Sequence, residues 1–253
     1  MNFGLRVITG LLLSAGLLLS GCAQSKTLKV GVENDFRPFT YMESGEHKGF
    51  EVELWEAIAQ KGGLRYELVP METQEISPAL KSGKIDLAIA GMTVNKARKD
   101  ELAFSDPYFQ TGLVMLTTAD NETIRSKDDL QGKTVATKLD STSYVYAGSL
   151  PGLKEAKGYP DIDQAYADLL AKKADCVIFD ERNIHDFMQH AGNGRVKLVG
   201  EVLNKESYAV AAKKRNRYLG SVNSAIEQVS RNGTYESLYM KWFGSEPRKL
   251  PGE

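Results

Sequence analysis

The stretch from Gly91 to Arg98 combines residue types that bind a small anion. The apolar run of residues 85–90 is typical of a buried strand, and Gly91 lets the backbone turn at its end. Thr93 or Asn95 can then cap a helix that carries Arg98 in its first turn. A guanidinium binds a carboxylate through two parallel hydrogen bonds, and a helix N-terminus adds N–H donors. We therefore expect a carboxylate site at this strand-to-helix junction.

Other apolar strands also end in polar groups. The strand of residues 29–32 ends at Glu33, and the strand of residues 174–179 ends at Asp180. A further strand, residues 134–138, leads into a hydroxyl-rich segment that can start a helix. Because ligands of open α/β sheets bind outside the carboxyl ends of strands, these ends can line one cleft.

The residues at these ends match the chemistry of a free α-amino acid. Its carboxylate and ammonium lie about 3 Å apart, so its site must offer a cation and an anion side by side. Arg98 and the Thr93 N–H are expected to bind the carboxylate, helped by the helix start near residue 141. The ammonium is expected at Asp180, the Thr93 hydroxyl and the Gly91 carbonyl.

Strands and helices alternate in two sets, which predicts two α/β lobes. The first set has strands at residues 29–32, 65–69 and 86–90 and helices at 51–60 and 75–81. The second has strands at 134–138 and 174–179 and helices at 162–172 and 183–189. A strand at 208–212 and helices at 218–229 and 235–242 follow. This order is typical of mainly parallel sheets with helices on both faces.

Several motifs in fixed order give the chain a family resemblance. It resembles the bacterial extracytoplasmic solute-binding proteins, family 3, of polar amino-acid ABC transporters, and among them most closely the glutamine-binding members. The similarity covers residues 28–243 and rests on residues 49–54, 90–98, 104–106, 174–180, 232–235 and 242–244.

The resemblance implies a two-lobed α/β fold of the type II periplasmic-binding-protein kind, in which the chain crosses between the lobes twice. Closure of the lobes would bury the ligand. The family implies a monomer that delivers a free L-amino acid to membrane permease subunits. The expected division is lobe 1 at 27–108 and 208–244, lobe 2 at 113–203, a hinge at 109–112 and 204–207, and a tail at 245–253.

Side-chain specificity is predicted where the chain departs from the glutamine-binding members. Glu33 aligns with an Asp that contacts the ligand's amide, and Phe36 matches an aromatic wall. Thr73 replaces a second Phe, while Phe179 replaces a His and is expected to supply an apolar face. Thr142 replaces a Gly, as in many basic-amino-acid binders. The predicted ligand-binding residues are Glu33, Phe36, Gly91, Thr93, Arg98, Lys138, Ser141, Thr142, Phe179 and Asp180.

Lys138 decides between ligand classes. If Glu33 and Lys138 both reach the pocket, they offer one acceptor and one donor, which suits the neutral amide of glutamine. A cationic ligand would face Lys138 and an acidic one would face Glu33, and like-charge contacts are costly. If Lys138 points outward, arginine, lysine or histidine is the alternative.

The N-terminus predicts export. The apolar segment of residues 7–19 follows one Arg and is too short to span a membrane, as in a signal peptide. Residues 19–22 resemble a lipobox, so residues 1–21 would be removed, Cys22 lipidated and residues 22–26 left as a linker. Lipid chains on Cys22 would hold the chain at a membrane surface, in the periplasm or on the outer face of the cell membrane.

Other function classes are disfavoured. A net charge of −1 without a basic run argues against nucleic acid. Cys176 lies in an apolar strand and reads as an inert core thiol, and His185 and His190 are poorly spaced for a metal. We expect no cofactor and no catalysis. A dehydratase-like enzyme using Glu33 or Asp180, or a ligand-sensing module, remains the alternative of another class.

Overall fold

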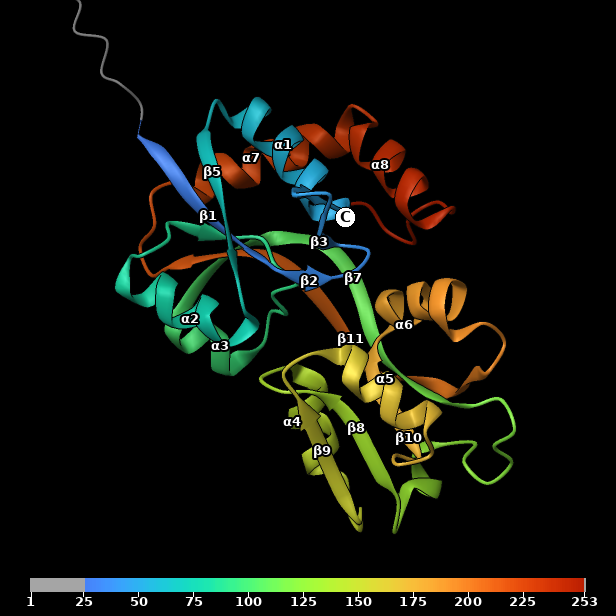
Figure 1. Ribbon diagram of the computed structural model, residues 1–253. Helices are drawn as coiled ribbons and strands as arrows, with labels where there is room; N and C mark the ends of the chain where they lie inside the picture. Colours follow the sequence, from blue (N-terminus) through green and yellow to red (C-terminus); the bar gives the residue numbers. More distant parts are fainter. Residues whose placement is uncertain (1–25, 253) are drawn as a thin grey trace, which may run out of the picture.

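Two α/β lobes joined by two long strands make up the computed structural model, which describes residues 26–252 (Figure 1). The long strands are β7 (Leu102–Thr118) and β11 (Val196–Lys213), paired antiparallel from one lobe into the other. The predicted signal segment and Cys22 lie outside the described residues. Within residues 26–252, no helix combines the length and apolar character needed to cross a bilayer.

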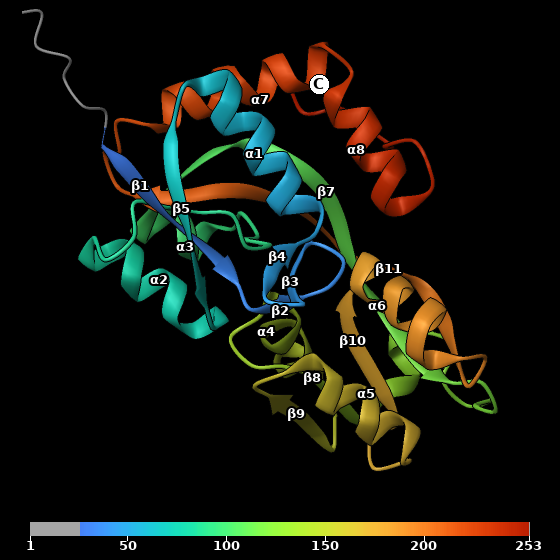
Figure 2. The ribbon, with the colours of Figure 1, turned by 45° about the horizontal axis from the view of Figure 1, so that its top comes forward.

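The first lobe is built on β1 (Thr27–Glu33), which runs parallel to both β5 (Arg65–Met71) and β6 (Leu87–Ala88). Helices α1 (Phe50–Gly62), α7 (Leu219–Arg231) and α8 (Thr234–Phe243) cover one face of this sheet (Figure 2). Helices α2 (Thr73–Ser82) and α3 (Lys96–Glu101) lie on the other side. The alternation predicted from the sequence is confirmed, although the third strand is shorter than expected.

The second lobe repeats this arrangement. Its strand β8 (Thr134–Lys138) lies parallel to β9 (Glu155–Tyr159) and β10 (Cys176–Asp180). Helices α4 (Thr142–Ser149), α5 (Ile162–Leu170) and α6 (Glu181–Phe187) connect or follow these strands, with a 3₁₀ turn η1 (Lys127–Leu130) before β8. The helix predicted at 183–189 begins earlier and ends in a π-helical turn η2 (Met188–Gly192).

The two long strands connect the lobes. Their pairing has register shifts, one of them between Val199 and Asn204. Both segments predicted as hinges, residues 109–112 and 204–207, lie inside these strands. The full length of β7 and of β11 was not predicted, because their pairing partners are about a hundred residues apart in the chain.

A small hairpin sheet also went unpredicted. It consists of β2 (Asp35–Phe36), β3 (Thr40–Glu43) and β4 (Glu46–Lys48), where the sequence indicated only an aromatic loop and a polar turn. These strands are too short to show an alternating pattern.

An aromatic cluster anchors both long strands to the first lobe. The Phe39 ring centroid lies 4.9 Å from that of Phe109 on β7 and 5.4 Å from that of Tyr208 on β11. Phe50 of α1 and Phe243 of α8 complete the cluster at 6.2 and 5.7 Å from Phe39. Such edge-to-face contacts stabilise beyond area burial alone. Each long strand is therefore fixed to the first lobe at the first-lobe end of its predicted hinge segment.

Gly49 lets α1 start against the hairpin. Its φ is +129°, and an added Cβ would lie 2.1 Å from the Phe39 carbonyl oxygen. This close approach allows the Phe50 and Glu51 N–H groups to donate to the carbonyls of Pro38 and Phe39, at 3.0 and 2.8 Å. Two helix N–H groups that lack intrahelical partners are thus satisfied.

Glu51 links α1 to two parts of the structure that border the cleft. Its Oε1 accepts hydrogen bonds from the Tyr108 hydroxyl of β7 and from the Gly91 N–H, the latter at 2.8 Å. The side chain is fully buried, and this burial raises the pKa of Glu51 from its ordinary value of 4.5 to about 7. The hydrogen bonds from Tyr108 and Gly91 oppose the shift.

Gly49→Ala is expected to destabilise the fold by at least about 2 kcal/mol, because it adds a clash to a backbone conformation that only glycine adopts readily. Gly45→Ala is the matched control: its φ is +83°, but nothing lies within 4 Å of an added Cβ, so a loss of about 1 kcal/mol is expected. Urea unfolding midpoints measure both. Equal losses would contradict the role given to the Phe39 contact.

Glu51→Gln should change how stability depends on pH. Since the folded-state pKa of Glu51 is raised above the unfolded value, the folded protein holds an extra proton between pH 4.5 and 7. Stability from this group therefore falls as pH rises through that window, and the loss is complete above it. The free energy of unfolding of wild type relative to Glu51→Gln should fall by about 3 kcal/mol from pH 4.5 to 8. Urea titrations across this range measure it. The exposed Glu56→Gln is the control, and a flat difference for Glu51→Gln would mean that the folded state holds no extra proton on Glu51.

Candidate amino-acid-binding cleft

Strand ends from both lobes meet at the cleft. Glu33 ends β1 in the first lobe, and Lys138 ends β8 in the second. Their side chains form a direct ion pair between the lobes, and each is only 7% exposed. The Thr73 hydroxyl donates to Glu33 Oε1 at 2.8 Å, so the residue that replaces a second aromatic wall supports the carboxylate instead. Burial raises the pKa of Glu33, and Lys138 opposes that shift.

The Gly91-to-Arg98 junction is built as the sequence predicts. Asn95 caps α3, and its Oδ1 accepts the Arg98 N–H at 2.9 Å. The Arg98 guanidinium donates to the Thr93 carbonyl at 3.1 Å, which holds the side chain along the junction. Gly91 has a φ of +55°, and a Cβ there would lie 2.4 Å from the Phe36 ring. Glycine therefore allows the ring of Phe36 to reach the backbone at this point.

Asp180 brings a carboxylate toward Arg98. It ends β10, is buried, and accepts a hydrogen bond from the Tyr208 hydroxyl. Burial, followed by the nearby Glu206 carboxylate, raises the pKa of Asp180 to about 7. Burial lowers the pKa of Arg98, while Glu206 and Asp180 oppose that shift. A partly exposed cation and a buried anion thus lie near one another, as an amino-acid head group requires.

The start of α4 is the second-lobe side of the site. Ser141 is the N-cap residue: its Oγ accepts the Tyr144 N–H at 3.1 Å and donates to the Lys138 carbonyl at 2.6 Å. Its hydroxyl is therefore used in forming the helix end. Thr142 follows as the first helical residue, where backbone N–H groups have no intrahelical partner and can bind an anion.

Phe36 and Phe179 form one apolar corner. Their ring centroids lie 6.0 Å apart with planes at 81°, and Phe36 also stacks on Phe39 at 4.9 Å. Both rings are buried. Because Phe179 meets Phe36 edge-on, the two rings form one continuous apolar side and do not stand opposite each other.

Glu206 is a cleft residue that the sequence reasoning missed. It lies on β11, is 6% exposed, and its Oε2 accepts the hydroxyls of Thr93 at 3.1 Å and Thr142 at 2.9 Å. The sequence places it in a polar segment interpreted as a hinge. Its position two residues before Tyr208 would indicate a buried side chain at the cleft only if the pairing register of β7 and β11 were already known.

A cavity of about 750 Å³ opens at the Arg98 end of the cleft. Both lobes and β11 contribute to its walls, including Thr93, Arg98, Thr142, Tyr146, Lys205 and Glu206. Four of the ten predicted ligand-binding residues, Thr93, Arg98, Ser141 and Thr142, therefore line this cavity together with Glu206.

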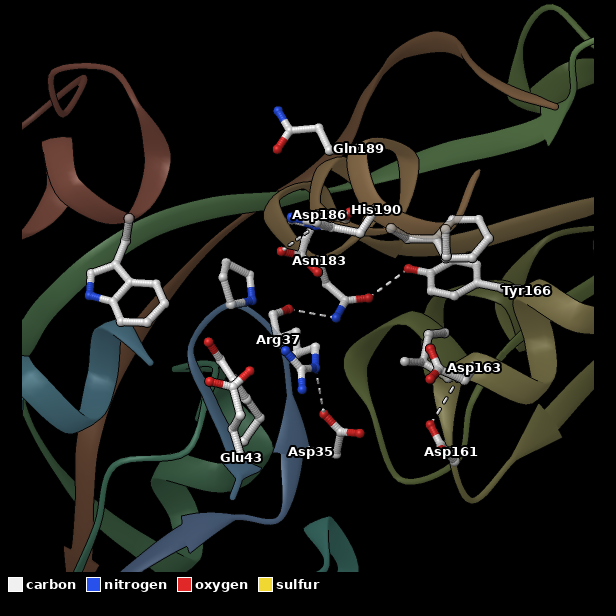
Figure 3. A pocket seen from close by; sticks show the side chains of 16 residues that line it. Asp35, Arg37, Glu43, Asp161, Asp163, Tyr166, Asn183, Asp186, Gln189 and His190 are labelled. Carbon is white, nitrogen blue, oxygen red and sulfur yellow. Dashed lines mark hydrogen bonds and ion pairs between the residues drawn. The ribbon is translucent and has the colours of Figure 1, made fainter. Parts of the chain in front are cut away.

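A second cavity of about 580 Å³ lies at another rim between the lobes (Figure 3). There Asn183 donates to the Arg37 carbonyl at 2.7 Å and so connects the lobes. Asp35, Asp163 and Asp186 surround this contact, and burial raises the pKa of each. None of the ten predicted ligand-binding residues lines it.

A metal centre and a reactive thiol are two other kinds of site that residues 26–252 could form. No cluster of three or more His, Cys, Asp or Glu in that part of the chain is arranged to hold a metal ion. Cys176 is a buried free thiol, and burial raises the pKa of Cys176 to about 12, as expected for an unreactive core position.

Comparisons with known proteins agree with this geometry. The model of "bacterial extracellular solute-binding proteins, family 3" matches residues 28–245. The L-cystine-binding protein TcyJ of Escherichia coli K12 is 31% identical over 235 residues, covering 92% of this chain and 88% of that protein.

Two solved structures are also similar. An ancestral arginine-binding protein bound to arginine has a TM-score of 0.81 and 38% identity, covering 86% of this chain and 98% of that one. An ancestral arginine-binding protein bound to glutamine has a TM-score of 0.77 and 38% identity, covering 87% and 98%. The chain thus belongs to the bacterial extracellular solute-binding proteins, family 3, and is an amino-acid-binding protein of the kind that serves ABC transporters.

Proposed function

We propose that the chain binds free glutamine between its lobes and delivers it to the permease subunits of an ABC importer. The observation that carries this proposal is the Glu33–Lys138 ion pair across the cleft. The head group is assigned to Arg98, Thr93, Gly91 and Asp180, with the N–H groups at the start of α4. The side chain then extends to Glu33 and Lys138 along the corner of Phe36 and Phe179.

The ion pair offers complementary groups to an amide. Thr73 and Lys138 both bond Glu33 Oε1, and no hydrogen bond within residues 26–252 uses Oε2. An amide N–H can donate to this oxygen, and the Lys138 ammonium, which has three donors, can bond the amide carbonyl. Glu33 and Lys138 together carry no net charge, so a ligand with an uncharged side chain keeps the side-chain end of the site neutral.

A basic amino acid is the second candidate. Three buried carboxylates, Glu33, Asp180 and Glu206, face only two cations, Arg98 and Lys138. A ligand with a net positive charge would balance this set when Asp180, whose pKa burial raises to about 7, is ionised. Similarity to an arginine-binding protein solved with arginine supports the same alternative.

The proposed function includes closure of the lobes and attachment to a membrane. We assign the lobe boundaries at 108/113 and 203/208, with closure through residues 109–112 and 204–207 of the long strands. The chain is proposed to act as a monomer that is exported and held at a membrane through lipid on Cys22. The complete head-group site favours binding without chemistry over a dehydratase-like reaction or a sensory role.

The first test is thermal unfolding of the exported chain, refolded to remove bound ligand, against each of the twenty amino acids and cystine. At 100-fold excess over Kd, a ligand stabilises by about 2.7 kcal/mol, or roughly 5–10 °C. A shift with glutamine alone is expected.

Arg98→Ala should remove this shift, whereas Lys99→Ala, an exposed change on the same helix, should keep it. A shift only with basic amino acids would replace glutamine by the second candidate, and a shift in Arg98→Ala would overturn the head-group site.

Lys138→Met separates the two ligand classes. If glutamine is the ligand, the loss of the donor and the unpaired Glu33 should weaken glutamine binding by at least about 10-fold. Arginine binding should strengthen, because a like charge is removed and Glu33 is freed. Calorimetric titration with both amino acids measures the change, with the exposed Lys154→Met as control. Unchanged glutamine affinity would mean that Lys138 does not contact the ligand.

A further inference from the structure

The Glu206 carboxylate accepts hydrogen bonds from hydroxyl groups of both lobes. We propose that Glu206 is a positioning residue for ligand recognition: it orients the Thr93 and Thr142 hydroxyls as hydrogen-bond acceptors and so directs the ligand's ammonium toward Thr93 and Asp180. This inference rests on the proposed function, because it requires an α-amino acid in the cleft.

Three donors converge on the Glu206 carboxylate. Its Oε2 accepts from Thr93 at 3.1 Å and from Thr142 at 2.9 Å, and its Oε1 accepts from the Asn204 side-chain amide at 3.1 Å. With 6% of the residue exposed, water has little access to these bonds. Hydrogen bonds to an ionised acceptor are about twice as strong as neutral ones. The carboxylate therefore fixes the direction of each hydroxyl.

The direction of a hydroxyl determines what it can recognise. A threonine hydroxyl has one proton and two lone pairs, and here the proton is donated to Glu206. Thr93 can then accept a hydrogen bond from an ammonium, but it cannot donate to a carboxylate. The ligand's carboxylate is left to Arg98 and to the backbone N–H groups at the start of α4. Glu206 thereby directs the ligand's ammonium to Thr93 and leaves its carboxylate to Arg98 and the start of α4.

The charges around Glu206 support the same arrangement. Of the charged groups near Arg98 and Asp180, Glu206 has the strongest electrostatic effect on each: it raises the pKa of both side chains. An ammonium placed beside Thr93 would lie among the carboxylates of Asp180 and Glu206. Removing the Glu206 charge would reduce this attraction and free both hydroxyls to rotate.

The three groups come from three parts of the chain. Thr93 belongs to the first lobe, Thr142 begins α4 in the second, and Glu206 lies on β11 between them. The Thr93 and Thr142 hydroxyls can both donate to Glu206 Oε2 only when the two lobes are as close as they are in this structure. Orientation of the hydroxyls and approach of the lobes are therefore coupled.

A purely structural role predicts a different result from a positioning role. If Glu206 only holds the lobes together, its loss weakens every ligand by the same factor. If it orients acceptors for an ammonium, its loss weakens amino acids selectively. Analogues in which hydrogen replaces the α-ammonium distinguish the two.

The experiment measures binding of L-glutamine, L-arginine and their des-amino analogues, 4-carbamoylbutanoate and 5-guanidinopentanoate, by calorimetry and ligand-observed NMR. Glu206→Gln should weaken the amino acid that binds by at least about 10-fold and its analogue by less than about 3-fold. Glu201→Gln, an exposed change on the same strand, should alter neither. Equal weakening of amino acid and analogue, or no weakening, would overturn the positioning role.

A double-mutant cycle with Thr93→Val keeps the proposal falsifiable when the analogue binds too weakly to measure. Because Glu206 acts partly through the Thr93 hydroxyl, Glu206→Gln should weaken binding by a smaller factor in the Thr93→Val background than in wild type. Independent losses that multiply would overturn the inference. If the wild-type protein binds the amino acid and Glu206→Gln binds it with the same affinity, this inference alone is overturned. Wild-type protein that binds neither glutamine, arginine nor cystine would overturn the proposed function with it.

Discussion

The cleft depends on the burial of opposite charges beside one another. Asp180 and Glu206 are buried beside the partly exposed Arg98, and Glu33 and Lys138 form a buried ion pair at the other end of the site. An isolated buried charge costs several kcal/mol, so such a set is stable only with good geometry and further hydrogen bonds. Tyr208, Thr73, Thr93 and Thr142 supply those bonds from four different segments. The rest of the structure can be understood as the means of holding these donors in place.

That scaffold has a rigid side and a connecting side. The aromatic cluster around Phe39 fixes β7 and β11 to the first lobe at the place where each strand passes between the lobes, and Glu51 connects α1 with Tyr108 and Gly91. Gly91 and Tyr208, which border the head-group site, are thus held by the same packing that stabilises the lobe. The second lobe is attached through the strand pair and contributes Lys138, Thr142 and Asp180. Relative movement of the lobes would separate these from Glu33 and Thr93 without disturbing either core.

Local patterns were sufficient to predict the parts that are formed by neighbouring residues. Asn95 caps α3, Arg98 falls in the first turn, Ser141 caps α4, and Asp180 ends a buried strand, all as the residue types indicate. Glu206 could not be found in this way. Its importance comes from strand pairing that joins residues about a hundred positions apart, and a Glu in a polar stretch is ordinarily exposed. The same holds for Thr73, whose contact with Glu33 spans 40 residues. The directions of the two threonine hydroxyls likewise follow only from contacts between the lobes.

The arrangement separates recognition of the head group from recognition of the side chain. Under the proposed assignment, the head group is bound by the Gly91-to-Arg98 junction, Asp180 and the start of α4, while the side chain meets Glu33, Lys138 and Thr73. The two sets share no side chain, although the backbone carbonyl of Lys138 accepts a hydrogen bond from Ser141 at the start of α4. Interactions between groups that are not in contact are nearly additive. A change at residue 33, 73 or 138 can therefore alter the preferred side chain while the ammonium and carboxylate contacts persist. Glu206 differs in this respect, because it acts on the hydroxyls that every α-amino acid would meet.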